Sequence, residues 1–267
     1  MPIPRILLGA AIAAALSVSL AAQQAPVGIH HIQCVKVNPG QQAAVQEWID
    51  GDNHKLTQSL VDSGAYAMSL VLRTQMPAGT DAQCDYVFVT FYNGLPPAPK
   101  TREEISMALR KADIQMTAGA YNAKLSEMGK LVNDNITQYQ ALVGGAKKGD
   151  YLEFNSMSSP DPGACVAIEK KDWQPLAEQM VKDGNTDGWA INLQIFPRGA
   201  KDKTAVSSVD IYPSWDAFIN SYGSIGGACK KVHPDMDINS TIGQFEKLCS
   251  IQHTVLYKLV DVTVAAK

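Results

Sequence analysis

The sequence predicts an α+β protein made of two similar halves. Positions 120 residues apart match in one ungapped window, residues 61–92 against 181–212, with six identities. The identities include two glycines and one proline, residue types that govern local backbone geometry. Both halves also show the same order of apolar periodicities and turn signals, β-α-β-β-α-β. We therefore expect an internal duplication.

Each element of the first half has its own signal. The first extended run ends before a Pro-Gly pair, and the helix after it ends near a glycine, which favours a helix C-terminus. A turn at 77–79 separates two β-prone runs, of which the second is the strongest strand signal of the chain. Thr101 and Glu104 have capping-box spacing at the start of a long helix. The predicted elements are a strand at 29–37, a helix at 41–61, strands at 66–74 and 86–92, a helix at 101–131 and a strand at 136–143.

The second half repeats this order with one interruption. Three glycines and a Lys-Lys pair within residues 223–235 are expected to break the last helix. This stretch is interpreted as a mobile lid, an anion-binding loop or an ordinary surface loop. The predicted elements are a strand at 151–157, a helix at 166–182, strands at 189–196 and 205–212, a helix that begins near 214 and resumes at 239–248, and a strand at 251–262.

A β-α-β-β-α-β unit is the pattern of the ferredoxin-like sandwich, in which both helices cover one face of an antiparallel sheet. Two such repeats, at residues 29–145 and 150–262, can bury their bare faces against each other, sheet to sheet. The pattern resembles the dimeric α/β-barrel superfamily, here fused in one chain as a single α/β barrel. That superfamily includes antibiotic-biosynthesis-type monooxygenases, stress-responsive A/B-barrel proteins and haem enzymes such as chlorite dismutases. The resemblance covers residues 29–262 and rests on element order, so it transfers no functional residue.

A second resemblance starts at the first strand. Residues 28–33 have the sequence Gly-Ile-His-His-Ile-Gln, which resembles the opening of vicinal-oxygen-chelate domains, where a first-strand histidine binds a metal. Those units have the order β-α-β-β-β and lack the long helix predicted at 101–131. The second half also has no histidine in its first strand. This resemblance stays an alternative, and we expect no metal site.

The amino-terminal segment is typical of a secretory signal peptide. Arg5 precedes an uncharged, Ala-rich run that ends in small residues, with cleavage expected after Ala21 or Ala22. The alternative is an uncleaved membrane anchor, for which the run is at the lower length limit. We expect a periplasmic or secreted protein that loses residues 1–22 and is not stably inserted in a membrane. With 23 basic and 26 acidic residues, the chain also lacks the positive charge of a nucleic-acid binder.

The cysteines are odd in number, so at least one is unpaired within the chain. They are Cys34, Cys84, Cys165, Cys229 and Cys249. Their pairing stays open, with a Cys229–Cys249 bridge as one possibility in an oxidising compartment. Cys249 precedes His253 by four residues in a segment predicted to be extended. A shared metal ion is disfavoured there, because four extended residues span about 13 Å.

Standard catalytic motifs are absent, so the candidate site is sought among polar residues of buried strands. Glu153 lies in the first strand of the second half and Asp210 in the third, and both strands are central in the predicted sheet. Alternation places both acids on one face, expected to point toward the first half. Neighbouring carboxyl groups in a shielded cavity suit general acid–base catalysis. His253, in the last strand, is a candidate proton shuttle.

Three aromatic residues and one histidine are the candidates for ligand binding: Tyr212, Tyr92, Trp189 and His54. The structural alternative is that the acids are solvated near strand ends and that the aromatic residues belong to the core. We expect an exported, cofactor-free enzyme of lyase, isomerase or monooxygenase type acting on a small apolar or aromatic molecule. The alternative is a non-catalytic carrier, including one for haem with His54 or His253 as axial ligand. The sequence leaves the oligomeric state open.

Overall fold

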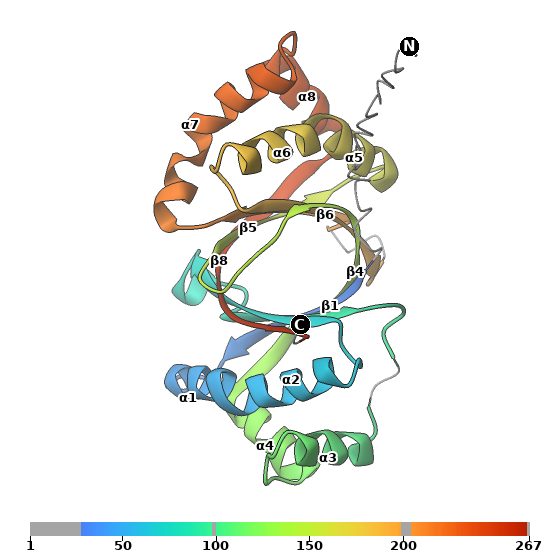
Figure 1. Cartoon of the computed structure of the whole chain (residues 1–267), viewed down its shortest axis with the longest axis vertical. Coiled ribbons are helices and arrows are strands. Elements are labelled where there is room, and N and C mark those ends of the chain that lie inside the picture. Colours follow the sequence, from blue (N-terminus) through green and yellow to red (C-terminus); the bar gives the residue numbers. More distant parts are fainter. Residues whose placement is uncertain (1–27, 98–99, 199–203, 266–267) are drawn as a thin grey trace, which may run out of the picture.

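The computed structural model describes residues 28–97, 100–198 and 204–265. Eight antiparallel strands form one closed barrel in the order β1-β3-β2-β8-β5-β7-β6-β4. Helices of the first half cover one side of the barrel, and helices of the second half cover the opposite side (Figure 1). The chain is therefore an α+β protein with a central barrel between two helical layers.

Both halves have the element order β-α-β-β-α-β, and each helical region is divided into segments. The strands are β1 Ile29–Val37, β2 Met68–Met76, β3 Tyr86–Tyr92, β4 Gly129–Gly144, β5 Tyr151–Ser158, β6 Gly188–Phe196, β7 Val206–Tyr212 and β8 Ser250–Val264. The helical segments are α1 Gln42–Trp48, η1 Ile49–Asn53, α2 His54–Asp62, η2 Gly79–Asp81, α3 Arg102–Lys111, α4 Ala118–Met128, α5 Pro162–Ile168, η3 Glu169–Trp173, α6 Gln174–Lys182, α7 Trp215–Val232 and α8 Ile238–Leu248. Of these, η1 and η3 are π-helical turns inside α-helical runs.

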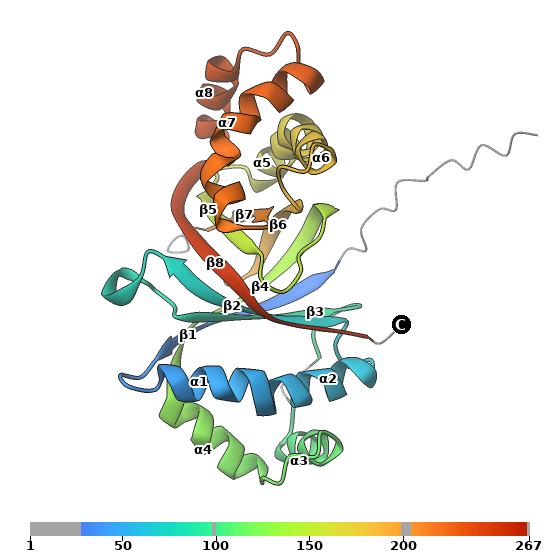
Figure 2. The ribbon, with the colours of Figure 1, turned by 60° about the vertical axis from the view of Figure 1, so that its left-hand side comes forward.

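The two long strands β4 and β8 close the barrel. β4 pairs with β1 of its own half and with β6 of the other, and β8 pairs with β5 and β2 in the same way. Figure 2 shows β8 curving from the layer of α7 and α8 down to the strands of the first half. The sequence predicted two repeats packed sheet to sheet as one fused α/β barrel; the barrel is confirmed, and its eight strands form one continuous sheet in place of two separate ones. The reason is that β4 and β8, with 16 and 15 residues, are long enough to reach beyond their own half.

Apolar side chains from both halves fill the barrel interior. Leu72, Leu152 and Val209 belong to one buried cluster there, although they come from three different strands. Because side chains alternate along a strand, the neighbours of these residues point outward, toward the helices. Outward residues therefore meet a second, separate core under each helical layer.

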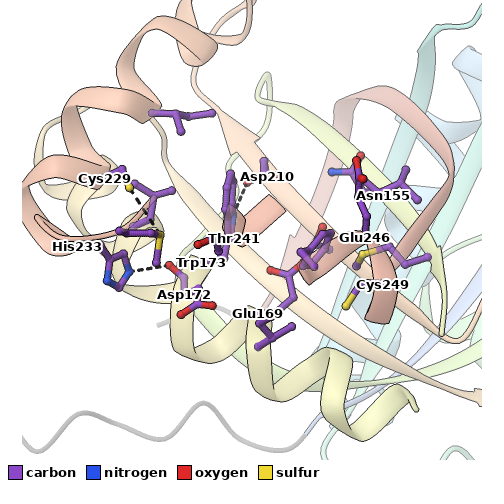
Figure 3. A pocket seen from close by; sticks show the side chains of 18 of the residues that line it. Asn155, Glu169, Asp172, Trp173, Asp210, Cys229, His233, Thr241, Glu246 and Cys249 are labelled. Atoms are coloured by element: carbon purple, nitrogen blue, oxygen red, sulfur yellow. Dashed lines mark hydrogen bonds between the residues drawn. The ribbon is translucent and has the colours of Figure 1, made fainter. Parts of the chain in front are cut away.

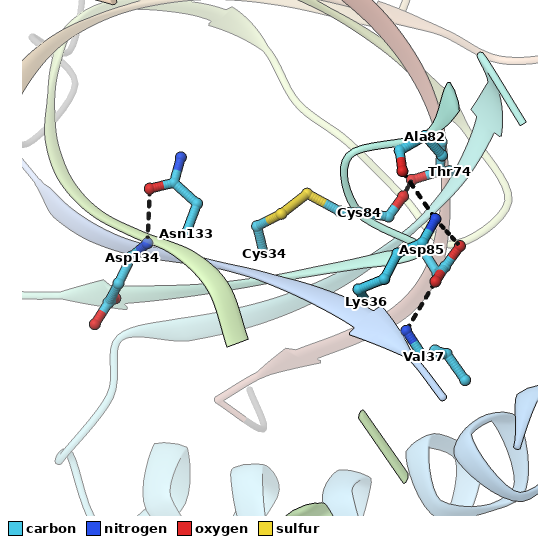
Figure 4. Close-up of a disulfide and its surroundings, with 9 residues drawn as sticks. All are labelled: Cys34, Lys36, Val37, Thr74, Ala82, Cys84, Asp85, Asn133 and Asp134. Atoms are coloured by element: carbon cyan, nitrogen blue, oxygen red, sulfur yellow. Dashed lines mark hydrogen bonds and ion pairs between the residues drawn. A yellow bond between two sulfur atoms is a disulfide. The ribbon is translucent and has the colours of Figure 1, made fainter. Parts of the chain in front are cut away.

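A disulfide between Cys34 and Cys84 ties β1 to the segment before β3. Beside it, the Asp85 carboxylate accepts hydrogen bonds from the Val37 backbone N–H at 2.8 Å and from Lys36 Nζ at 3.2 Å (Figure 4). The long connection between β2 and β3 is thereby fastened to β1 by a covalent bond and by an ion pair.

The second disulfide joins Cys165 of α5 to Cys249, which directly precedes β8. Cys229 of α7 is buried and keeps a free thiol. The Cys229–Cys249 pairing that the sequence left open is therefore wrong. Cys229 does not pair with Cys249 because α7 packs on α6, where Cys229 shares an apolar cluster with Leu176 and Met180.

The helix predicted at 101–131 is two helices, α3 and α4, followed at once by β4. Asp113, just after α3, has a φ of 55°. That left-handed conformation ends a helix. The Thr117 side chain then caps α4 by accepting a hydrogen bond from the backbone of its first turn. The capping box of Thr101 and Glu104 is present as predicted.

The break predicted at residues 223–235 is wrong for most of its length, because α7 continues to Val232. A glycine inside a helix costs about 1 kcal/mol relative to alanine. Burial of Ala228 and Cys229 against α6 offsets that cost. The interpretation of this stretch as a lid or an anion-binding loop is therefore not supported.

The expected signal peptide, residues 1–22, lies outside the described residues. Among the helices that are described, none combines the length and the apolarity needed to cross a membrane. The connection between the halves is short, since β4 ends at Gly144 and β5 begins at Tyr151. The Asp150 carboxylate accepts the Lys147 backbone N–H at 2.8 Å and so shapes this connection.

Candidate active site

A cavity of about 830 Å³ lies in the second half, between the outer face of the barrel and helices α5 to α8. Strands β5 and β7 contribute to its floor, and η3 with the surrounding helices forms its walls (Figure 3). Its surface is mainly apolar. The apolar side chains that line it include Met157, Ile168, Leu176, Ile225, Met236 and Phe245.

Glu153 and Asp210 lie directly opposite each other on neighbouring strands, as register partners of β5 and β7. The prediction that they share one face is confirmed, but the expected direction of that face is wrong. Their neighbours Leu152, Val209 and Ile211 fill the barrel interior. The acids therefore point away from the first half, toward the helices that cover the second.

Asp210 lines the cavity and accepts a hydrogen bond from Trp173 Nε1 at 3.4 Å. Burial, followed by the nearby Glu153 charge, raises the pKa of this carboxyl group to about 7, and the Trp173 hydrogen bond acts in the opposite direction. A carboxyl group with a pKa near neutrality can both take and give a proton under physiological conditions. Asp210 is thus suited to acid–base chemistry.

Glu153 is 8 % exposed and is held by two phenol groups. The Tyr212 hydroxyl donates to one carboxylate oxygen at 3.0 Å, and the Tyr222 hydroxyl donates to the other at 3.3 Å. Burial, followed by the charges of Asp210 and Glu153, raises the pKa of Tyr212. Both phenols therefore stay protonated and keep Glu153 in place beside Asp210.

Glu169 is a cavity residue that the sequence analysis missed. It is the first residue of η3, it is 4 % exposed, and it has no hydrogen bond or ion pair with the described residues. Burial first, and then the Asp210 charge, raises the pKa of Glu169 to about 8. The run Glu-Lys-Lys-Asp that begins there resembles a solvated helix surface. The available signal was the 120-residue offset, which aligns Glu169 with apolar Ile49.

The two histidines proposed for chemistry lie elsewhere. His253 is exposed on β8, opposite Ser156, and does not line the cavity. His54 lies at the start of α2 in the first half, where Nδ1 donates to the Asp261 carboxylate at 3.0 Å. The structure therefore brings neither histidine to Glu153 and Asp210.

The proposed ligand-binding aromatic residues are mostly core residues. Trp189 is fully buried between the barrel and α5, and its Nε1 has no hydrogen-bond partner among the described residues. Tyr92 is buried in the first half and packs edge-on against Tyr66, with 5.6 Å between the ring centroids. Tyr212 is the one aromatic candidate beside the cavity, where its hydroxyl donates to Glu153.

The paired histidines of β1 do not form a metal site in the described structure. His30 is buried in the barrel interior against Phe91 and Tyr139, and burial lowers its pKa to about 3. His31 points outward and pairs with Asp134. Across the described part of the chain, no group of three His, Cys, Asp or Glu side chains is arranged to hold a metal ion. Together with the β-α-β-β-α-β order, this argues against the vicinal-oxygen-chelate alternative.

No protein-family model and no curated protein sequence matches the chain. Solved structures do match, among them chlorite dismutases and a haem-binding protein from Thermus thermophilus. The last has a TM-score of 0.44 and 9 % identity, and the match covers 88 % of this chain and 92 % of that one. The expectation of a cofactor-free protein is wrong in the light of this haem-binding neighbour, and we do not keep it.

The cavity itself is a poor match for haem. His233 is the one histidine among the described lining residues, and its Nε2 already donates to the Asp172 carbonyl at 2.9 Å. The described lining contains no Lys or Arg to neutralise propionates, whereas it contains the carboxyl groups of Glu169, Asp172, Asp210 and Glu246. We therefore derive no chemical step through haem.

Two similar structures are bacterial proteins that are provisionally named monooxygenases. The protein from Fusobacterium nucleatum subsp. nucleatum has a TM-score of 0.52 and 8 % identity, with 89 % of this chain and 94 % of that chain covered. The protein from Lactobacillus acidophilus has a TM-score of 0.53 and 7 % identity, with 89 % and 96 % covered. At this identity the likeness extends to the fold alone. The chain thus has the fold of the dimeric α/β-barrel proteins, as the order of its elements predicted.

Proposed function

We propose that the protein is an enzyme that binds a small, largely apolar molecule in the second-half cavity and transfers protons on it. One observation carries this proposal: Glu169 and Asp210 line a mainly apolar cavity, and their pKa values are raised to about 8 and about 7. Titratable pairs whose pKa values are displaced and separated are typical of acid–base sites.

The two carboxyl groups take different roles between pH 7 and 8. Asp210, which has the lower pKa of the two, gives up its proton first and serves as the base, while Glu169, which has the higher pKa, keeps its proton longer and serves as the acid. Asp210 removes a proton from one atom of the substrate, and Glu169 returns a proton to another. The substrate then has no net change in protons, which fits an isomerase or lyase. Such general acid–base catalysis contributes about 10²–10⁴-fold in rate.

Neighbouring side chains position the base. Trp173 Nε1 holds one Asp210 oxygen, and Glu153, fixed by Tyr212 and Tyr222, keeps the Asp210 pKa raised. The apolar walls exclude water and strengthen these electrostatic effects. Glu153 is thereby a positioning residue in this proposal, in place of the catalytic role first expected for it.

Monooxygenation is the second candidate. The names of the Fusobacterium and Lactobacillus proteins favour it. In that reaction this chain's residues would carry the removal of a substrate proton by Asp210. A non-catalytic carrier that uses the same cavity is the outcome if binding occurs without turnover.

The test combines binding and exchange. N-phenyl-1-naphthylamine, a neutral fluorescent probe, is expected to bind once per chain and to be excluded by Ile225→Trp, which fills the cavity. Proton NMR in D₂O then follows exchange of the acidic C–H groups of 2-indanone and related ketones, expected to be faster with the protein than with Asp210→Asn. Probe binding without exchange across the ketones favours the carrier, and absence of probe binding rejects the cavity as a site.

We also propose that residues 29–145 and 150–262 are ferredoxin-like repeats that arose by duplication. Two features support this: η1 and η3 occupy positions 120 residues apart, and Gly64 and Gly184 share a left-handed φ of 74° and 76° after the helices that follow those turns. The divergence of the copies accounts for the presence of the cavity acids in the second half only.

A further inference from the structure

We infer that the cavity selects a molecule that joins an apolar body to a cationic group, such as a protonated amine. This inference rests on the proposed function, because it names the class of molecule that the same cavity takes. It is carried by the charge of the lining, by an unpartnered buried acid and by the aromatic wall next to it.

The charge of the lining has one sign. Glu169, Asp172, Asp210 and Glu246 line the cavity, and the described part of the lining has no Lys or Arg. Exposed Lys171, which does not line the cavity, pairs with Asp172 at 3.7 Å, and the lining residue His233 donates its Nε2 proton to a backbone carbonyl and not to an acid. Glu169 and Asp210 have no basic partner among the described residues. A ligand with a carboxylate or phosphate would therefore meet repulsion without a compensating cation.

Glu169 lacks the partner that acids elsewhere in the chain have. Asp85 is paired with Lys36 at 3.2 Å and Asp183 with Lys231 at 2.8 Å, although both of these acids are more exposed. Glu169 is 96 % buried and aimed into the cavity with no partner among the described residues. Burying an ionised carboxylate without a partner is unfavourable. A bound cation supplies the missing partner.

The cavity also has a surface for the rest of such a molecule. Trp173 stands beside Asp210 and on the same turn as Glu169 (Figure 3). An indole face attracts a cation, and the apolar side chains of Ile168, Leu176 and Phe245 provide contacts for an apolar body. Acid and aromatic groups at one end and apolar groups around them fit an arylalkylamine.

Binding of a cation changes the protonation of the two cavity acids. A positive charge next to Glu169 and Asp210 favours their ionised forms, so that binding releases protons near pH 7 and affinity rises with pH until both acids are ionised. The complex in which Glu169 still holds the proton that it gives up as the acid is therefore favoured at lower pH. Other titratable groups contribute to the same balance. Those around the two acids are Glu153, Asp172, Tyr212, Tyr222, Cys229, His233 and Glu246, together with Lys171, which pairs with Asp172 at 3.7 Å.

Isothermal titration calorimetry with two matched probes tests the inference. 4-Phenylbutylamine carries the cation, and 4-phenylbutan-1-ol is a neutral molecule of nearly the same shape. We expect the amine to bind at least tenfold more tightly at pH 8 and to release protons, measured as a dependence of the heat on the ionisation enthalpy of the buffer.

Three variants locate the effect. Glu169→Gln, which keeps the shape of the side chain, is expected to abolish most of the preference for the amine, and Asp210→Asn to reduce it. Glu178→Gln is the matched control, because Glu178 is an exposed acid on α6 that does not line the cavity. It is expected to keep the full preference. Circular dichroism confirms that each variant is folded.

Equal affinities, or a preference for the alcohol, would overturn the inference and leave the proposed function in place. The same holds if N-phenyl-1-naphthylamine binds and the amine does not. If the preference for the amine survives in Glu169→Gln and Asp210→Asn, the cation is recognised elsewhere and the inference is also wrong. Absence of binding by all three probes rejects the proposed function itself.

Discussion

Ile49 and Glu169 are the first residues of the two π-helical turns and stand 120 positions apart in the chain. Ile49 is completely buried in the apolar core of the first half, whereas Glu169 is almost as buried but faces a cavity. A second pair of positions 120 residues apart shows the same change from an uncharged residue to an acid: β3 of the first half has Thr90, and β7 of the second half has Asp210. π-Helical turns inside α-helices occur frequently at functional sites. The second half thus carries acids on a backbone that the first half uses for packing.

The two cavity acids make stability depend on pH. Their pKa values are about 8 and about 7 in the folded chain, above the usual values of 4.5 and 3.8. Between these limits the two acids bind more protons in the folded state than in the unfolded state, so their contribution to the free energy of unfolding falls as pH rises from about 4 to about 8. His30, whose pKa is lowered to about 3, contributes in the opposite direction below about pH 6.5, so the fall is clearest between pH 6.5 and 8. Urea unfolding at intervals of pH checks this. A stability that rises through that interval would contradict the assignment of the two acids.

Glu169→Leu is expected to stabilise the protein at pH 8.5. The substitution puts an apolar side chain in place of an unpaired buried carboxylate, as at Ile49 in the first half, and so removes a desolvation cost on the order of a few kcal/mol. The gain should shrink toward pH 5, where Glu169 is protonated. Thermal and urea unfolding at both pH values measure the difference. A loss of stability at pH 8.5 would mean that Glu169 has a partner in solution.

Asp210→Asn is expected to reduce turnover by about 10²–10⁴-fold without loss of stability. The amide keeps the shape and can still contact Trp173, but it cannot accept a proton as a base. The measurement is the deuterium exchange rate of a ketone that the native protein activates. His253→Ala is the comparison, because His253 lies on β8 away from the cavity, and its exchange rate should stay native. Equal losses in both variants would place the site elsewhere.

The Cys165–Cys249 disulfide is expected to contribute more to the free energy of unfolding than the free thiol of Cys229. It closes a separation of 84 residues and joins α5 to the start of β8. Removing a disulfide of this kind costs about 2–5 kcal/mol. Cys165→Ser should therefore unfold at clearly lower urea concentration than Cys229→Ala. Thiol titration of the native chain in denaturant should find one reactive sulfhydryl, and three or five would contradict the observed pairing.

Export remains a prediction from the sequence. Cleavage after Ala21 or Ala22 gives a mature chain that starts at Ala22 or Gln23. Intact-mass spectrometry of the protein from a periplasmic fraction checks the new terminus. Recovery of the uncleaved chain with the membrane fraction would favour the anchor.

The order of elements was predictable from apolar periodicity and turn residues. In each half, glycines and prolines mark where the periodicity of a strand gives way to that of a helix, or the reverse. The shared face of Glu153 and Asp210 was predictable too, because alternation along a strand fixes which residues lie together. Alternation does not say which face meets the helices, and that depends on how the barrel closes. Glu169 could not be predicted for a related reason. It lies in a run of charged residues, which is typical of an exposed helix surface, and only the packing of the strands and helices around it shows that it is buried.

Barrel closure by β4 and β8 has a consequence for any attempt to separate the halves. A chain cut within residues 145–148 would yield two fragments, each with a long strand whose outer edge belongs to the other fragment. Exposed strand edges of this kind form hydrogen bonds with other strands, so each fragment should either reassemble with the other fragment or dimerise with a second copy of itself. The short connection then acts chiefly as a tether that sets the local concentration of one half around the other.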